Sequence, residues 1–190
     1  MKIYDISQEV FTSVVFPGDE KPSFVRNSSM EKGDVCNVTI LTMCAHNGTH
    51  MDAPFHFVRE GKTIEELDLY HCVGDCTLKA FEKQPTAEEL NEVLKHSRKK
   101  VILKGPVTIT MELAKCILEY NLELIGVESQ SVAPMEAPRE VHVELLEKEV
   151  VLLEGLKLDE VEEGEYFLVA APLKLGGSDG APVRAILLDK

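Results

Sequence analysis

The chain of 190 residues contains no tryptophan, six histidines and far fewer basic than acidic residues. Its 20 lysines and arginines against 33 aspartates and glutamates give a formal net charge of −13, which argues against nucleic acid or an anionic membrane surface as a partner. No apolar run approaches the roughly 20 residues that cross a bilayer. The first ten residues, MKIYDISQEV, also lack the apolar segment of a signal peptide, so we expect a cytoplasmic protein.

The five cysteines form no recognisable framework, because their number is odd and they are widely scattered. Cys72 and Cys76 are separated by three residues, whereas redox and zinc-binding pairs have two. In a cytoplasmic protein we therefore expect reduced, mostly buried thiols rather than disulfides.

The hydrophobic content of 44% is typical of a globular protein and sufficient for a sizeable core. No internal repeat or linker-like segment divides the chain, so we expect a single domain over residues 1–190. Strand patterns dominate the first third. They include KIYDIS at the start and the β-branched residues 34–45, which we predict to form a central strand.

Later in the chain, strands alternate with short helices. Thr86 and Glu89 form a capping-box pattern at the start of a helix predicted to end near residue 97, and Thr110 caps a second helix. LELIGVES and VVLLEGL are expected strands on either side of a third helix, REVHVELLEKE, and two strands flanking the turn GGSDGAP close the chain. The expected fold class is α/β, with a mixed central sheet and short flanking helices.

Half of the histidines lie in the segment AHNGTHMDAPFHF (residues 45–57), together with one aspartate. Asn, Gly and Thr between His46 and His50 make this segment a poor helix. A chain that turns at the glycine can direct both imidazoles to one point. The two-residue step from His50 to Asp52 suits an extended segment, in which alternate side chains share a face. His56 can reach the same pocket from its rim.

Two imidazoles and a carboxylate suit Zn²⁺, Mn²⁺ or Fe²⁺, and three protein ligands leave one coordination position open for water. An open position is typical of a catalytic rather than a structural metal site. A lone histidine more often caps a turn or satisfies the core. Three histidines with an interleaved aspartate favour a metal site instead.

The segment HNGTHMDAPFHF resembles the H-x-G-T-H-x-D-x-P-x-H signature of the cyclase superfamily, which includes bacterial kynurenine formamidases and isatin hydrolases. The resemblance extends over most of the chain, through YDIS near the start, FPGD at residues 16–19, IGVES at 125–129 and PLKLGGSDGAPVRAIL near the end. It implies a compact swivelling β/β/α fold and metal-dependent hydrolysis of an amide or lactam C–N bond.

The resemblance further implies two metal ions, zinc or alternatively manganese, bridged by the motif aspartate. A later histidine and a glutamate twelve residues beyond it complete the pair in the dinuclear formamidases, and His142 and Glu154 have this spacing. Glu154 also follows the apolar run VVLL, so a strand would carry it to the carboxyl end of the sheet, where α/β sites gather. His56 matches the proton-transferring residue. The implied ligands are His46, His50 and Asp52 for one ion, and Asp52, His142 and Glu154 for the other.

The resemblance implies an arylformamidase that converts N-formylkynurenine to kynurenine and formate. Alternatives are a cyclic amidase of the isatin hydrolase type, a ring-closing cyclase and a metal-dependent binding protein. Phe16 stands where the formamidases usually have tryptophan as an aromatic wall of the substrate pocket, while Glu128 and Ala133 stand where they have aspartates. The metal ligands are intact, so these departures bear on the substrate. The family also suggests a homodimer or homotetramer.

The glycine-rich segment GGSDGAP near the C-terminus lacks the Lys-Ser/Thr of a phosphate loop. We interpret it as a tight backbone turn that packs near the site.

Overall fold

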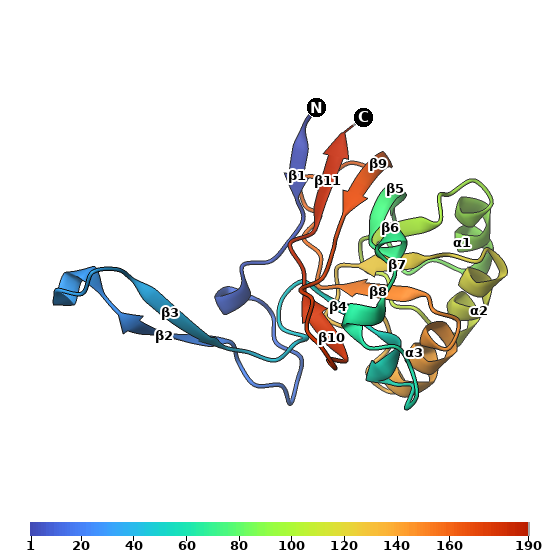
Figure 1. Cartoon of the computed structure of the whole chain (residues 1–190). Helices are drawn as coiled ribbons and strands as arrows, with labels where there is room; N and C mark the ends of the chain where they lie inside the picture. Colours follow the sequence, from blue (N-terminus) through green and yellow to red (C-terminus); the bar gives the residue numbers. More distant parts are fainter. Residues whose placement is uncertain (190) are drawn as a thin grey trace.

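The computed structural model describes residues 1–189, and a mixed sheet of nine strands runs through this part of the chain (Figure 1). The strands β5 to β8 pair in parallel, and the other neighbours in the sheet are antiparallel. The expected mixed central sheet is therefore confirmed. In spatial order the strands are β1 (Ile3–Asp5), β11 (Ile186–Asp189), β9 (Gly164–Val169), β5 (Val73–Ala80), β6 (Lys100–Lys104), β7 (Leu124–Val127), β8 (Val151–Glu154), β4 (His50–Asp52) and β10 (Gly180–Pro182).

The α-helices connect the parallel strands in three successive βαβ units, from β5 to β8. The predicted capping box starts the first helix: the Thr86 hydroxyl accepts from the Glu89 N–H, and the Glu89 carboxylate accepts from the Thr86 N–H. Thr110 caps the second helix as predicted. No helix within residues 1–189 is both long and apolar enough to span a membrane. The helices are α1 (Ala87–Leu94), α2 (Met111–Glu119) and α3 (Pro138–Leu146).

The parallel strands direct alternate residues into two cores on opposite faces of the sheet. On β7 and β8, Ile125 and Leu152 pack with the helices, whereas Leu124 and Leu153 belong to the other core. Strands β1, β11 and β9 curl around that second core, and Figure 1 shows them nearly upright while β6 to β8 run across the view. Helices therefore cover one face, and the sheet itself closes around the other.

Two short strands lie beyond β8 at one edge of the sheet. β4 pairs with β8 on one side and with β10 on the other. The turn predicted for GGSDGAP is present at Gly176 and Gly177, but the last three residues of the segment form β10, and Gly180 and Ala181 are buried. Glycine, alanine and proline have low strand propensity, so the local sequence carries no signal for this pairing.

Residues 34–45 do not form a central strand, contrary to the prediction. β3 (Val38–Thr42) pairs with β2 (Ser23–Ser28) in a separate two-stranded sheet that extends away from the body (Figure 1). Every residue of β3 is exposed. The β-branched residues indicated a strand correctly, but strand propensity does not distinguish a core strand from an exposed one. We call residues 23–42 the arm.

Candidate metal centre

The pairing of β4 with β8 brings the first candidate ligands together. His50 and Asp52 lie on the same face of β4, as their two-residue spacing predicted, and both are buried. Gly48 makes the expected turn before this strand with a φ of 67°, a conformation that favours glycine. Glu154 is the last residue of β8 and is the register partner of His50. Its carboxylate is buried, in contrast to the exposed acids that surround it in sequence.

The fourth candidate comes from helix α3, where His142 is buried although it lies on a surface helix. Its Nε2 atom lies 3.7 Å from Asp52 Oδ2 and 3.5 Å from Glu154 Oε1. His50 Nε2 lies 3.5 Å from Asp52 Oδ1 and 3.2 Å from Glu154 Oε2. Two imidazoles therefore face the same two carboxylates from different elements of the fold.

The other ring nitrogen of each imidazole holds its orientation. His50 Nδ1 lies 3.0 Å from the carbonyl oxygen of Gly48, and His142 Nδ1 lies 2.6 Å from that of Pro138. A carbonyl oxygen only accepts, so each Nδ1 carries a hydrogen and each Nε2 is the nitrogen directed at the carboxylates, where a metal ion could bind it. Metal-binding histidines are typically oriented by this kind of bond.

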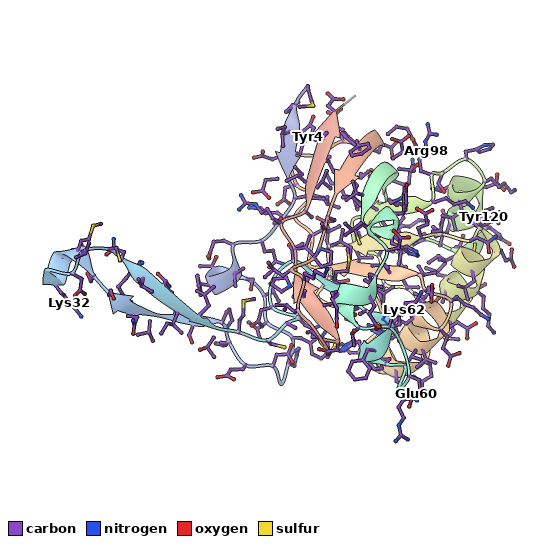
Figure 2. The ribbon with its side chains drawn as sticks, in the orientation of Figure 1. Tyr4, Lys32, Glu60, Lys62, Arg98 and Tyr120 are labelled. Carbon is purple, nitrogen blue, oxygen red and sulfur yellow. The ribbon has the colours of Figure 1, made fainter. Side chains whose placement is uncertain are left out.

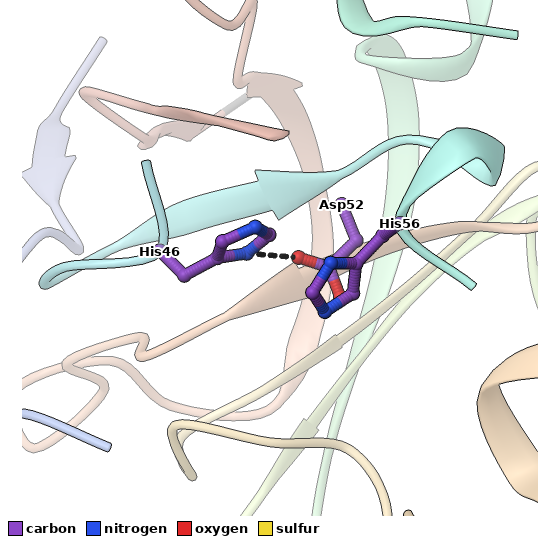
Figure 3. A group of neighbouring side chains, drawn as sticks. All are labelled: His46, Asp52 and His56. Atoms are coloured by element: carbon purple, nitrogen blue, oxygen red, sulfur yellow. Dashed lines mark hydrogen bonds and ion pairs between the residues drawn. The ribbon is translucent and has the colours of Figure 1, made fainter. Parts of the chain in front are cut away.

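His46 and His56 also lie close to Asp52. His46 Nδ1 is 2.9 Å from Asp52 Oδ1, and Figure 3 shows this bond with His56 beside it. The two imidazole rings are 4.1 Å apart between centroids and tilted by 30°. Asp179, which precedes β10, lies 2.9 Å from His46 Nε2 and 3.0 Å from His56 Nδ1 through one oxygen, Oδ2. All three histidines of the motif thus converge, as predicted.

Sequence reasoning did not find Asp179. GGSDGAP was interpreted as a backbone turn, and the acid within it was not weighed as a side chain that could bond to the histidines. The signal available was a lone aspartate inside a glycine-rich segment shared with the cyclase superfamily.

The electrostatics of the centre favour ionised carboxylates and charged imidazoles. Burial alone would lower the pKa of His46, but its hydrogen bonds to Asp179 and Asp52 outweigh burial and raise that pKa to about 11. Burial alone would raise the pKa of Asp52, yet the bond from His46 and the nearby imidazoles hold it well below its usual value. Hydrogen bonds from His46 and His56 hold the pKa of Asp179 far below its usual range.

The donor set fits a divalent metal. Asp52 Oδ2 is buried and has no hydrogen-bond partner among residues 1–189, although His142 Nε2 lies 3.7 Å from it. A buried carboxylate oxygen without a hydrogen bond is costly unless a cation satisfies it. His46, Asp52 and His56 form one group whose possible ligand atoms lie within 4.8 Å of one another, and His50, Asp52 and Glu154 form a second.

Asp52 belongs to both groups, and the other residues are divided differently from the expected ligand sets. The expected sets place His50 with His46, whereas the geometry places His50 with Glu154, and it places His56 with His46 and Asp52. His142 faces the second group, as expected, through Asp52 and Glu154.

A cavity of about 210 Å³ opens over these residues. Phe16 lies in its lining, where the sequence placed an aromatic substrate wall. Phe57 provides a second ring, which stacks on His142 at 4.4 Å between centroids and meets His56 edge-on at 4.5 Å. The lining of the cavity therefore combines imidazole and carboxylate groups with two aromatic side chains.

The two other departures from the formamidase pattern lie outside this lining. Glu128 accepts hydrogen bonds from the backbone N–H groups of Gly105 and Leu158, at 2.6 and 3.3 Å, so its carboxylate ties two loops together. Ala133 is buried and lines a neighbouring cavity that also contacts Phe16. Of the three departures, Phe16 is the one in the lining of the cavity over the candidate metal centre.

Comparisons with known proteins identify the family of the chain. A kynurenine formamidase of Geobacillus thermodenitrificans is 37% identical to the chain over 200 residues, covering 96% of this chain and 95% of the relative. A solved structure described as a "potential metal-dependent hydrolase with cyclase activity" superposes with a TM-score of 0.86 at 28% identity, covering 100% of this chain and 98% of that chain. An isatin hydrolase structure shares the fold, with a TM-score of 0.81, 17% identity and coverage of 100% and 93%. Residues 4–134 match the Cyclase family model, and the chain belongs to that family.

Proposed function

We propose that this protein hydrolyses the amide bond of a small N-acyl arylamine, with N-formylkynurenine as the leading substrate. The central observation is Asp52, a buried carboxylate whose Oδ1 atom faces His46 and His50 and whose Oδ2 atom faces His142. The kynurenine formamidase relatives support the reaction class, because they align with nearly the whole chain.

The donor set supports zinc as the cofactor, with manganese as the alternative, because imidazole and carboxylate ligands suit both ions. His46, His50, Asp52, His142 and Glu154 would hold one or two ions, with Asp52 shared between them. A bound divalent metal polarises a carbonyl oxygen and lowers the pKa of a water molecule from 15.7 toward about 7.

The side chains around the metal ligands supply the remaining chemistry. His56 would accept a proton from the attacking water and return it to the leaving nitrogen, so that amide and water become carboxylic acid and amine. Phe16 and Phe57 would hold an aromatic substrate above the ligands by stacking. No cysteine, serine or threonine nucleophile is needed for this reaction.

Turnover of a substrate panel with and without chelator tests this function. The panel contains N-formylkynurenine, simple N-acyl anilines, a cyclic imide and isatin. We expect hydrolysis of the open-chain amides, loss of activity with chelator and recovery with zinc. Turnover that survives complete metal removal contradicts the proposal. Faster turnover of isatin indicates a cyclic amidase, and binding without hydrolysis indicates a non-hydrolytic member.

We also propose that the protein is a homodimer assembled through the arm. Phe24 and Leu41 face each other across the arm, as do Val25 and Ile40, and all four side chains are at least half exposed. An isolated two-stranded sheet is at best marginally stable in water, so both apolar faces need cover. Figure 2 shows Lys32 at the far end of the arm, well away from the body.

A second copy of this chain is the partner that the charge distribution favours. The arm contains two basic residues, Arg26 and Lys32, and two acidic residues, Glu31 and Asp34, so the net charge of −13 lies on the body. A neutral arm avoids the repulsion between two acidic bodies, and a two-fold arrangement would cover both arms at once. Phe16 lies just before the arm and His46 just after it, so the partner would be near the site.

Light scattering after gel filtration tests the assembly. Val25→Asp combined with Ile40→Asp should convert the dimer to a monomer, whereas Tyr70→Asp, on an exposed apolar residue of the body, should leave it intact. A monomeric wild type, or loss of the dimer only with Tyr70→Asp, contradicts the arm interface. A tetramer that the arm variant reduces to dimers supports the interface but not the stoichiometry.

The free state of all five cysteines supports a cytoplasmic location, where thiols remain reduced.

A further inference from the structure

Asp179 joins two histidines of the site through a single carboxylate oxygen. Its Oδ2 atom lies 2.9 Å from His46 Nε2 and 3.0 Å from His56 Nδ1. The two rings lie nearly face to face, so one acceptor can reach both. No other carboxylate within residues 1–189 contacts both rings at hydrogen-bond distance.

The chemistry of this oxygen determines where the ring hydrogens are. An ionised carboxylate only accepts hydrogen bonds, so His46 Nε2 and His56 Nδ1 must each carry a hydrogen. At His46, the opposite nitrogen, Nδ1, faces the Asp52 carboxylate, which also only accepts, so Nδ1 carries a hydrogen as well until a metal ion replaces it. At His56, Nε2 is left as the nitrogen that can accept a proton.

The loop around Asp179 does not depend on this side chain for its shape. The Ser178 hydroxyl donates to the Gly180 carbonyl at 2.7 Å, and the Gly177 N–H donates to Glu65 at 2.8 Å. The backbone carbonyl of Asp179 accepts from the Ala53 N–H at 2.9 Å, which a side-chain substitution would preserve. The carboxylate is therefore available to act on the histidines.

We propose that Asp179 is a positioning residue that orients His46 as a metal ligand and His56 as a proton acceptor, and that sets the tautomer of each ring. The roles of His46 as a metal ligand and His56 as a proton acceptor rest on the proposed function. The hydrogen bonds between Asp179 and the two rings are independent of that function. Loss of an acceptor that orients a metal-binding histidine typically costs about 10–100-fold in metal affinity or activity.

The test compares Asp179→Ala and Asp179→Asn with Ser178→Ala, a neighbour in the same loop whose hydroxyl bonds to backbone. Nitrogen-15 NMR of the zinc-loaded protein should show His46 with its hydrogen on Nε2 and His56 with its hydrogen on Nδ1. In Asp179→Ala both assignments should be lost, zinc should bind about 10–100-fold more weakly, and kcat at saturating zinc should fall by a similar factor with little change in KM.

Asp179→Asn keeps one acceptor oxygen without the charge, so it should restore the ring assignments in part and fall between the wild type and Asp179→Ala. Ser178→Ala removes a hydrogen bond within the loop but keeps the carboxylate, so it should lose much less zinc affinity and kcat than Asp179→Ala and keep both ring assignments. An unchanged His56 tautomer in Asp179→Ala overturns the proposal, and so does an equal loss in Ser178→Ala, which would indicate a role in loop structure alone.

The two proposals fail in different ways. If the wild type hydrolyses nothing in the panel, the proposed function is wrong, and the NMR and zinc measurements still decide whether Asp179 orients the rings. If the wild type binds no zinc, NMR of the metal-free protein still tests the role of Asp179. The proposal then requires a hydrogen-bonded Nδ1–H on His56 in the wild type and its loss in Asp179→Ala.

Discussion

His50 and Glu154 are register partners across the antiparallel pair of β4 and β8, and His50 Nε2 lies 3.2 Å from Glu154 Oε2. Both side chains are buried. The register of one strand pair therefore brings together two candidate ligands that are distant in sequence. A slip of one residue would turn His50 and Asp52 to the other face of the sheet, so strand pairing and metal-site geometry are linked.

The first prediction concerns this pair. His50→Ala should lower the zinc content of the purified protein sharply, because it removes an imidazole that faces both Asp52 and Glu154. Elemental analysis after dialysis against zinc at neutral pH measures the content. His96→Ala, which removes an exposed histidine after helix α1, is the matched control and should keep its metal. Equal zinc in the wild type and His50→Ala would exclude His50 as a ligand.

The second prediction concerns the contact between Gly180 and His46. A Cβ atom on Gly180 would lie 2.6 Å from His46 Cε1 and 2.8 Å from the carbonyl oxygen of Met51. The backbone oxygen cannot move easily, so Gly180→Ala should displace His46 and destabilise the fold by about 1–3 kcal/mol. Urea unfolding and zinc affinity measure the two effects.

Gly164→Ala is the control for that substitution, because its Cβ would meet the nearest atoms of Tyr166 at an ordinary 3.6 Å. Gly164→Ala should change neither the stability measured by urea unfolding nor the zinc affinity appreciably. If Gly180→Ala binds zinc as the wild type does, His46 either tolerates the displacement or does not bind the metal.

The sequence predicted the local elements of the site well. A poor helix sequence around Gly48 and a two-residue step between His50 and Asp52 indicated a turn followed by an extended segment, and both are present. The apolar run before Glu154 indicated a strand that ends at the site, which is also correct. These predictions succeeded because they depend on periodicity and backbone preference, which local sequence encodes.

Other features depend on contacts between distant segments and could not be predicted in the same way. The arm was predicted as a central strand because β-branched residues suit core and exposed strands alike. Asp179 reaches the histidines only because β10 pairs with β4, and residues 180–182 have no strand signal. The departure at Glu128 was weighed as a change near the substrate, whereas its carboxylate accepts from two backbone N–H groups.

The third prediction follows from Glu128. Glu128→Ala leaves the N–H groups of Gly105 and Leu158 without their acceptor, which should cost about 1–3 kcal/mol in the free energy of unfolding. The relative kcat/KM values across the substrate panel should stay unchanged, since Glu128 does not line the cavity over the candidate metal centre. Glu160→Ala, at an exposed acid, is the control and should change stability by less than about 0.5 kcal/mol. If Glu128→Ala changes the ranking of the substrates by kcat/KM, Glu128 does contribute to substrate selection.

The fourth prediction concerns thiol chemistry. Burial raises the pKa of Cys72 to about 12, so at pH 8 the group is almost entirely the unreactive thiol. Iodoacetamide at pH 8 should leave Cys72 unmodified in the folded protein and modify it in urea, as mass spectrometry of peptides would show. The pH would have to approach 12 before the thiolate became abundant in the folded state. Modification of Cys72 in the folded protein at pH 8 would contradict this environment.

The fifth prediction separates His56 from the metal ligands. His56 lies beyond Asp52 in the motif and bonds to Asp179, so its substitution should leave His50, Asp52 and Glu154 in place. General acid–base groups typically contribute about 10²–10⁴-fold to the rate. His56→Ala should therefore lose activity on that scale and retain zinc, whereas His46→Ala should lose both. The two measurements are kcat on N-formylkynurenine and zinc content of the same preparation.

The geometry makes the opposite outcome equally informative. A ring nitrogen of His56 can lie within 4.8 Å of the ligand atoms of His46 and Asp52, which is close enough for the three residues to share one ion. If His56→Ala loses zinc as completely as His46→Ala does, His56 is a ligand, and a different group must carry the proton to the leaving nitrogen. Asp179 would then orient two ligands of one ion, and its substitution by alanine would reduce zinc affinity rather than the rate at saturating zinc.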